Sequence, residues 1–264
     1  MVSESPARIV RFETIGHVAL VTISRPEALN SVNADLATAL GETIERAQQD
    51  AAVRVIVITG DGRAFSTGMD LKAFAAGEDV APRGHPEWGF AGVVRHAVDK
   101  PVIAAVNGLA FGGGAEIAFA ADLIVADEDA IFRLPEVAIG LFAAAGGVLR
   151  LGQQLPQRIA AELVLTGRSF TAQEAERWGL VNEVAPAGTV VDRALALAST
   201  IAANAPLAVQ ASNRILRASR TDDSWGDIAW ARNTAEMERV FGSVDALEGA
   251  TAFAEKRAPV WRGV

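Results

Sequence analysis

The sequence predicts an α/β fold, because apolar β-branched runs alternate with helical patterns and the chain becomes all-helical towards its C-terminus. Residues 53–59 (VRVIVIT) are bounded by turn residues, which is typical of a strand covered on both faces. After about Leu197 no strong strand pattern appears. We therefore expect an α/β core over residues 1–197 and a helical region over residues 198–264.

The first elements follow from turn and capping residues. Two strands, Ile9–Phe12 and His17–Ser24, are expected to meet at a turn at Gly16. Asn33 has the side chain of a helix N-cap, and apolar residues at helical spacing extend to about Asp50. Further strands are expected at residues 53–59, 102–106, 122–126 and 131–134.

Helical signals dominate the later part of the chain. Thr171–Glu174 has the pattern of a capping box, and Gly179 ends the helix that it starts. The helices expected near the C-terminus span residues 198–203, 207–219, 224–241 and 245–257. No low-complexity linker precedes them, so we expect this region to pack on its own core or on a neighbouring subunit.

The composition disfavours several kinds of chemistry. Half of the 264 residues are apolar and 21% are charged, which excludes a disordered chain. Cysteine is absent, and the three histidines form no HExxH motif, so we expect no disulfide, thiol nucleophile or metal site. The net charge of −8 disfavours nucleic acid as a partner.

No targeting signal is expected. The first nine residues carry Glu4 and Arg8 without an apolar stretch, which predicts a cytoplasmic protein. Residues 102–121 are apolar but contain Glu116 and a glycine run, both unsuited to a membrane span. We interpret this stretch as a strand, a turn and a buried helix, and expect no membrane partner.

Glu116 is the first candidate for chemistry. The residues three and four positions away on the expected helix are all uncharged, so no polar stripe surrounds this carboxyl group. Burial of that kind raises a carboxyl pKa unless a distant cation reaches it. A functional carboxylate and a structural ion pair are both consistent with this pattern.

Three further features can assist a carboxylate. The glycines of Gly112–Gly114 leave N–H groups at a helix start, which suits a phosphate or an oxyanion, or simply a tight turn. Gly62–Asp70 contains Ser66 and Thr67 without a GxSxG motif, so it supplies a backbone donor or is a polar loop. Glu136 is either an exposed strand-end residue or a partner of Glu116.

Together these segments resemble the crotonase (enoyl-CoA hydratase/isomerase) superfamily, nearly from end to end. The two glutamates are 20 positions apart, as in hydratases of that family. The segments that carry the resemblance are Arg25–Asn30, Phe65–Leu71, Asn107–Ala126, Phe132–Gly140, Thr166–Val184 and Ala252–Gly263.

The resemblance implies a crotonase-like spiral of ββα units whose helical region builds homotrimers, often paired into hexamers. It implies syn addition of water to a 2-enoyl-CoA to give a 3-hydroxyacyl-CoA, as in β-oxidation of fatty acids. The backbone N–H groups of Thr67 and Gly113 would form an oxyanion hole. Glu116 would activate the water, and Glu136 would exchange the α-proton. The acyl-CoA is the substrate, and no cofactor is expected.

The resemblance also implies binding residues. The expected contacts to CoA are Glu27, Ala28, Leu29, Lys72 and Lys256. The expected substrate pocket contains Met69, Leu71, Trp88, Phe90, Gly112, Ala143 and Ala144. Residues 74–100 match the family least, and we interpret them as a loop that sets acyl-length preference or as a surface excursion.

One departure from the family keeps other activities open. Residues 140–147 read GLFAAAGG where hydratases usually have GxxPGxGG, so Ala143 replaces a proline and Ala144 replaces a glycine near the catalytic water. A specialised lyase resembling carnitinyl-CoA dehydratase is therefore an alternative. An isomerase is disfavoured by the second glutamate. A non-catalytic RNA-binding relative would have to use the arginines of residues 213–220, which more often form a solvated or subunit-facing stripe.

Overall fold

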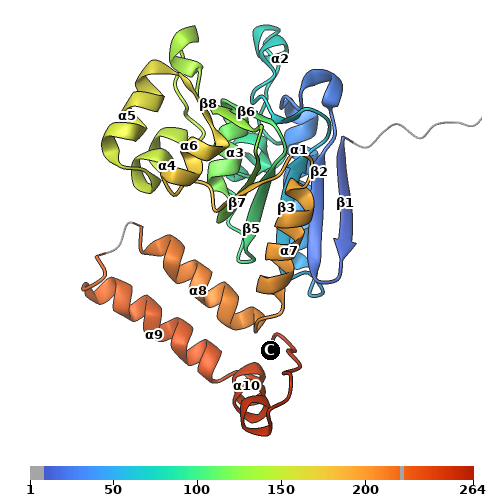
Figure 1. The fold of residues 1–264 in the computed structure, drawn as a ribbon, viewed down its shortest axis with the longest axis vertical. Helices are drawn as coiled ribbons and strands as arrows, with labels where there is room; N and C mark the ends of the chain where they lie inside the picture. Colours follow the sequence, from blue (N-terminus) through green and yellow to red (C-terminus); the bar gives the residue numbers. More distant parts are fainter. Residues whose placement is uncertain (1–8, 221–222) are drawn as a thin grey trace, which may run out of the picture.

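The computed structural model describes residues 9–220 and 223–264, so the N-terminal residues behind the targeting expectation lie outside the described part. Two sheets and the helices around them form the core, and α8, α9 and α10 extend away from it (Figure 1). This arrangement confirms the expected α/β fold with a helical C-terminal region.

The larger sheet has six strands in the order β1-β2-β3-β5-β7-β10. β1 pairs antiparallel with β2 through the turn at Gly16, and all other neighbours in this sheet are parallel. Its strands are β1 (Val10–Ile15), β2 (Val18–Ile23), β3 (Val55–Gly60), β5 (Val102–Val106), β7 (Leu123–Asp127) and β10 (Glu183–Ala185).

Both faces of this sheet are covered, which explains why its central strands are apolar throughout. In β3, Ile56 and Ile58 face the core that contains α1, whereas Val55 and Val57 face a second core that contains α7. α7 begins at Val190, earlier than the helix expected at residues 198–203, because its small residues Ala194, Ala198 and Ala202 pack on the sheet.

The smaller sheet has the order β4-β6-β8-β9, in which β4, β6 and β8 are parallel and β9 is antiparallel to β8. Its strands are β4 (Ala64–Ser66), β6 (Leu109–Phe111), β8 (Ile131–Arg133) and β9 (Ser169–Thr171). The sequence analysis anticipated only the third of them, because the others are three residues long and carry no extended apolar run.

Helices fill the remaining layers. The expected caps are confirmed at Asn33, which accepts from Leu36 N, and at Thr171, whose capping box with Glu174 is complete. The α-helices are α1 (Ala34–Gln49), α2 (Leu71–Ala75), α3 (Gly113–Ala120), α4 (Gly147–Gln154), α5 (Gln157–Thr166), α6 (Ala172–Arg177), α7 (Val190–Ala202), α8 (Pro206–Ala218), α9 (Asp227–Phe241) and α10 (Val244–Glu255). The short 3-10 helices are Pro26–Ala28, Pro86–Trp88, Phe90–Gly92 and Glu136–Ile139.

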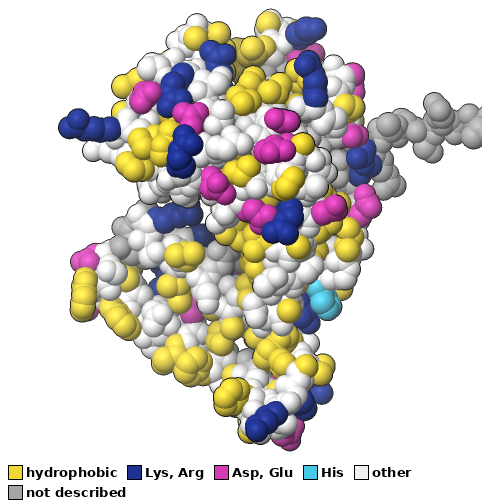
Figure 2. Space-filling model, viewed as in Figure 1, with side chains coloured by type: hydrophobic (Ala, Val, Ile, Leu, Met, Phe, Trp, Pro, Cys, Tyr) yellow, Lys and Arg dark blue, Asp and Glu magenta, His cyan; other side chains and the backbone are white. Residues whose placement is uncertain are grey.

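The C-terminal helices expose much apolar surface (Figure 2). α8 and α9 pack side by side, and α10 follows α9. The exposed large apolar residues of this region include Leu216, Trp225, Ile228, Trp230, Phe241, Leu247 and Phe253. Exposed apolar side chains gathered in one region mark a surface suited to association.

No single helix among the described residues is long and apolar enough to cross a membrane. Only α7 and α8 taken together meet the criteria of length and composition, and they are bent by 108° at the break between them.

The close approach of α3 to β4 depends on Gly114. A Cβ at this position would lie 2.0 Å from the backbone carbonyl oxygen of Ser66, which cannot move aside as a side chain can. We expect Gly114→Ala to lower the free energy of unfolding by at least about 2 kcal/mol, as overpacking does in a dense core. Urea denaturation measures this effect.

Gly152→Ala in α4 is the matched control, because no atom would lie within 4 Å of a Cβ at this position. It should leave stability unchanged or raise it by up to about 1 kcal/mol, the helix preference of alanine over glycine. Equal effects of the two substitutions would contradict the assigned α3–β4 contact.

Candidate active site

Three parallel strands end at one edge of the smaller sheet and bring the candidate residues together. Ser66 of β4 pairs with Ala110 of β6, and Phe111 of β6 pairs with Arg133 of β8. The segments that follow these strands therefore emerge side by side. They carry Thr67 after β4, the glycine turn and Glu116 after β6, and Glu136 after β8.

A hydrogen bond fixes the two glutamate-bearing segments to each other. Gly112 N donates to Arg133 O at 2.8 Å, so the turn before α3 is tied to the end of β8. A cavity of about 810 Å³ opens at this edge. The expected site residues that line it are Thr67, Met69, Leu71, Phe90, Gly112, Gly113, Glu116, Glu136 and Ala144.

Glu116 is buried, with 3% of its surface exposed. The pKa of this carboxyl group is raised to about 7, chiefly by burial and also by the nearby charge of Glu136, against the opposing effect of a hydrogen bond from Gly147 N to Oε1 at 2.8 Å. A carboxyl group with this pKa exchanges protons readily at neutral pH, which is the property of a general acid–base catalyst.

Glu136 begins the 3-10 helix that follows Pro135. Burial also raises the pKa of its carboxyl group. Its Oε2 atom is buried and has no hydrogen-bond partner among the described residues. An unpaired carboxyl oxygen beside a cavity is a natural contact for a water molecule or a substrate.

The glycines allow the backbone to approach these groups closely. Gly112 has a φ of +53°, and a Cβ there would lie 3.2 Å from Oε1 of Glu136. A Cβ on Gly113 would lie 2.3 Å from the ring of Phe90, and one on Gly68 would lie 2.6 Å from Gly113 N. A side chain at Gly112 would therefore crowd Glu136, and one at Gly113 or Gly68 would clash with Phe90 or with the backbone at the start of α3.

The two expected oxyanion donors differ in the structure. Gly113 is the first residue of α3, so its N–H has no acceptor within the helix, and no described turn or cap hydrogen bond engages it. Thr67 N instead donates to Leu29 O at 3.1 Å. Of the two expected donors, Gly113 thus has an N–H without an acceptor among the described turn and cap hydrogen bonds, whereas Thr67 N already has one.

Two expected pocket residues do not line the cavity. Trp88 is stacked between the rings of His85 and His96, at centroid distances of 3.8 and 4.3 Å, and packs on Gly41 of α1. Ala143 is buried beneath Gly147, the residue that donates to Glu116, so it supports the site from behind.

Other lining residues were not identified from the sequence. Residues 74–100 do border the cavity, as expected, but through side chains with no distinctive motif. Arg150 carried no local signal because it lies in an ordinary amphipathic helix, α4. The additional lining residues include Phe74, Val94, Arg95, Phe142, Leu149, Arg150 and Gln153.

The expected CoA-binding residues lie outside this cavity's wall. The segment around Leu29 borders it indirectly, through the hydrogen bond to Thr67. Lys72 is in α2 and Lys256 follows α10, at opposite ends of the molecule (Figure 1). A single chain therefore does not present both lysines to one ligand.

No group of three or more His, Cys, Asp or Glu residues in the described part of the chain is arranged to hold a metal ion.

Comparison with known proteins identifies the family of this chain. The family model described as enoyl-CoA hydratase/isomerase matches residues 13–264. A protein named carnitinyl-CoA dehydratase from Salmonella typhi is 45% identical over 256 residues, which cover 94% of this chain and 96% of that protein. The chain belongs to the enoyl-CoA hydratase/isomerase family, the crotonase superfamily.

Solved structures give the same result. An enoyl-CoA hydratase from Mycobacterium tuberculosis H37Rv is 45% identical, with a TM-score of 0.91 over 97% of this chain and 99% of its own. A carnitinyl-CoA hydratase from Mycobacterium avium is 53% identical, with a TM-score of 0.78 over 97% and 99% of the two chains. This chain is accordingly an enzyme of the hydratase and dehydratase type within its family.

The raised pKa of Glu116 makes stability depend on pH. Below its ordinary pKa of 4.5 the group is protonated in both the folded and the unfolded chain. Between 4.5 and about 7 only the unfolded chain ionises, so the folded state loses stability as the pH rises. We expect Glu116→Gln to stabilise the protein at pH 8, by up to about 3 kcal/mol, and much less at pH 5.

Denaturant titrations at the two pH values test this expectation. Glu13→Gln, at an exposed position of β1, is the control and should change stability at neither pH. A gain from Glu116→Gln that is the same at pH 5 and pH 8 would show that the pKa of Glu116 is not raised.

Proposed function

We propose that this enzyme adds water across the double bond of a 2-enoyl-CoA, or removes it from the 3-hydroxyacyl-CoA, using Glu116 and Glu136. One observation carries the proposal. Two carboxyl groups from separate segments, both with a raised pKa, line one cavity beside the open N–H at the start of α3.

The thioester carbonyl would bind at the start of α3. Polarising it gives the substrate enolate character, and a preorganised N–H group stabilises the developing charge. Gly113 N is ready for this role, and Thr67 N would join it by sharing or leaving its bond to Leu29 O. Loss of one such donor typically costs about 10² to 10³ in rate.

The glutamates would divide the proton transfers. In hydration, the Glu116 carboxylate removes a proton from water as the oxygen forms its bond to C3. A protonated Glu136 then donates a proton to C2 of the enolate, so atoms and charge balance. Burial raises the pKa of each group, and for Glu116 the value of about 7 keeps both protonation states accessible near neutral pH. Because the carboxyl groups interact, they titrate as a pair.

Dehydration of a carnitinyl-CoA-type substrate is the second candidate. Proteins with carnitinyl-CoA dehydratase or hydratase in their names are 45% and 53% identical to this chain. Ala144 lines the cavity where hydratases of the family usually have glycine, so its methyl group narrows the space beside the glutamates. Both candidates use the same carboxyl pair and differ in the acyl group that they accept.

The helical region would bring copies of the chain together. Its exposed apolar side chains suit burial in a homotrimer or hexamer. In such an assembly Lys256 of one copy could meet CoA held near Lys72 and residues 27–29 of another. A cytoplasmic location and a role in β-oxidation, with CoA as part of the substrate and no further cofactor, complete the proposal.

Hydration itself is tested with short and medium 2-enoyl-CoAs, beginning with crotonyl-CoA, by the loss of enoyl absorbance. We expect Glu116→Gln and Glu136→Gln each to lower kcat by about 10² to 10⁴, the usual contribution of a positioned acid or base. Glu13→Gln should keep the wild-type rate. A glutamate variant near the wild-type rate would remove that residue from the mechanism, and no turnover of any enoyl-CoA would refute hydration.

The oligomer is tested by light scattering. The chain of 27.6 kDa should have three or six times its own mass. The double substitution Leu247→Ser with Phe253→Ser, at side chains 72% and 87% exposed in α10, should reduce the mass. Leu165→Ser, at a side chain 74% exposed in α5, is the control and should not. A monomeric wild-type chain would contradict this part of the proposal.

A further inference from the structure

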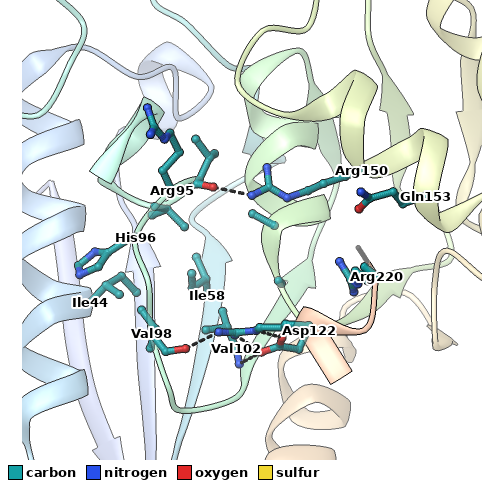
Figure 3. Close-up of a pocket in the computed structure, with 15 residues that line it drawn as sticks. Ile44, Ile58, Arg95, His96, Val98, Val102, Asp122, Arg150, Gln153 and Arg220 are labelled. Atoms are coloured by element: carbon teal, nitrogen blue, oxygen red, sulfur yellow. Dashed lines mark hydrogen bonds and ion pairs between the residues drawn. The ribbon is translucent and has the colours of Figure 1, made fainter. Parts of the chain in front are cut away.

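A second cavity of about 340 Å³ lies beside the catalytic one, between the core and the end of α8 (Figure 3). We propose that this arginine cavity binds an oxyanion, either a carboxylate or a phosphate. Four arginines line it, namely Arg95, Arg150, Arg217 and Arg220. The proposal depends on which of these charges already has a counter-ion.

Asp122 forms an ion pair with Arg217, and its two oxygens already accept four hydrogen bonds, so it does not neutralise the other three arginines. Arg217 Nε and Nη2 donate to Oδ1 and Oδ2 of Asp122, each at 2.6 Å. Oδ2 also accepts from Val102 N at 2.9 Å and from Asn213 Nδ2 at 3.1 Å. This ion pair closes one side of the cavity (Figure 3).

The other three guanidinium groups have no carboxylate partner within ion-pair distance among the described residues. Arg150 donates only to backbone oxygens, to Val94 O at 2.5 Å and to Ala145 O at 3.2 Å. Arg95 and Arg220 line the cavity with exposed side chains and take part in no described side-chain hydrogen bond or ion pair, and in Figure 3 the guanidinium group of Arg95 points away from Arg150 and Arg220. Arg150 and Arg220 are therefore close enough to repel each other, and Arg95 adds an exposed positive charge at the edge of the cavity.

Glu116, which lines the neighbouring cavity, partly offsets the charge of Arg150. No histidine or glutamate in the wall of the arginine cavity offsets the remaining charge. His96 lines the cavity, but its Nδ1 lies 3.1 Å from Gly92 O and its Nε2 lies 2.9 Å from Oε2 of Glu45. Glu45 is therefore already bonded to His96, and it does not line the cavity. Asp122 is the only carboxylate among the described residues that line the cavity, and Arg217 already neutralises it.

An oxyanion would relieve the mutual repulsion of these groups. Burial lowers the pKa of Arg150, the charge of Glu116 raises it, and the charge of Arg220 lowers it, so an added anion would offset both the burial of Arg150 and its repulsion from Arg220. Guanidinium groups donate in a planar fork that matches the oxygens of carboxylates and phosphates. The cavity is large enough for such a group and supplies several donors to it.

The anion has two possible sources, because the cavities share a wall. Val94, Arg95, Arg150 and Gln153 line both of them. A free anion can enter the arginine cavity, or the far end of an acyl chain can carry a carboxylate to the shared wall. The second source rests on the function proposed above, whereas the first is independent of it.

Thermal denaturation tests the site directly, with phosphate and glutarate as probes and chloride at matched ionic strength as the reference. We expect both probes to raise Tm saturably in the wild-type protein, and Arg220→Gln and Arg95→Gln to abolish the rise. Arg177→Gln, at an exposed position of α6 that lines neither cavity, should keep it. A far-ultraviolet circular dichroism spectrum and the Tm in chloride show that each variant folds.

Kinetics distinguish the two sources. Two 2-enoyl-CoAs of equal length are compared, one ending in a carboxylate and the other in a methyl group. If the acyl chain carries the anion, Arg220→Gln should lower the ratio of kcat/KM for the carboxylate substrate to kcat/KM for the methyl substrate about tenfold. A Tm effect with an unchanged ratio assigns a free anion. If the probes do not raise the Tm and the ratio does not change, the proposal is overturned. Absence of turnover with every enoyl-CoA, alongside a saturable Tm effect, would refute the proposed function and leave the anion site standing.

Discussion

The parallel pairing of β4, β6 and β8 is the constraint on which the rest of the site depends. Parallel neighbours end at the same edge, so segments far apart in the chain follow them into one place. Thr67, Glu116 and Glu136 meet there without being near in sequence. The bond from Gly112 N to Arg133 O holds the second and third segments in register. These strands have three residues each, and the larger sheet and its two cores supply the rigidity that they lack.

Close backbone packing around the glutamates makes the site possible and costs stability. Gly68, Gly112 and Gly113 leave no room for side chains between β4, α3 and Phe90. The same packing excludes water from Glu116, which raises its pKa and opposes its ionisation. The enzyme thus keeps a carboxyl group in an environment that disfavours its charged form, and the hydrogen bond from Gly147 offsets only part of that penalty. Burial of Glu116 therefore both raises its pKa towards neutral pH and lowers the stability of the fold above pH 4.5.

Charge is distributed unevenly across the catalytic cavity. Its carboxyl groups lie where the parallel strands end, whereas Arg95 and Arg150 lie on the wall shared with the arginine cavity. Arg150 is close enough to lower the pKa of Glu116 and is itself affected by Arg220. If a substrate binds as proposed, its thioester end would lie near the carboxyl groups and its acyl end near this arginine wall.

The sequence by itself determined the α/β class, the caps at Asn33 and Thr171, and the unusual position of Glu116, because each depends on neighbouring residues or on a local pattern. The resemblance of several ordered segments to one family also predicted the crotonase-like fold and a role for Glu136. Only the tertiary structure decided that Thr67 N bonds to Leu29 O, that Trp88 stacks on histidines, and that three arginines without carboxylate partners gather at one cavity. Those contacts join residues distant in the chain, and no local pattern of residues specifies which distant groups a fold brings together.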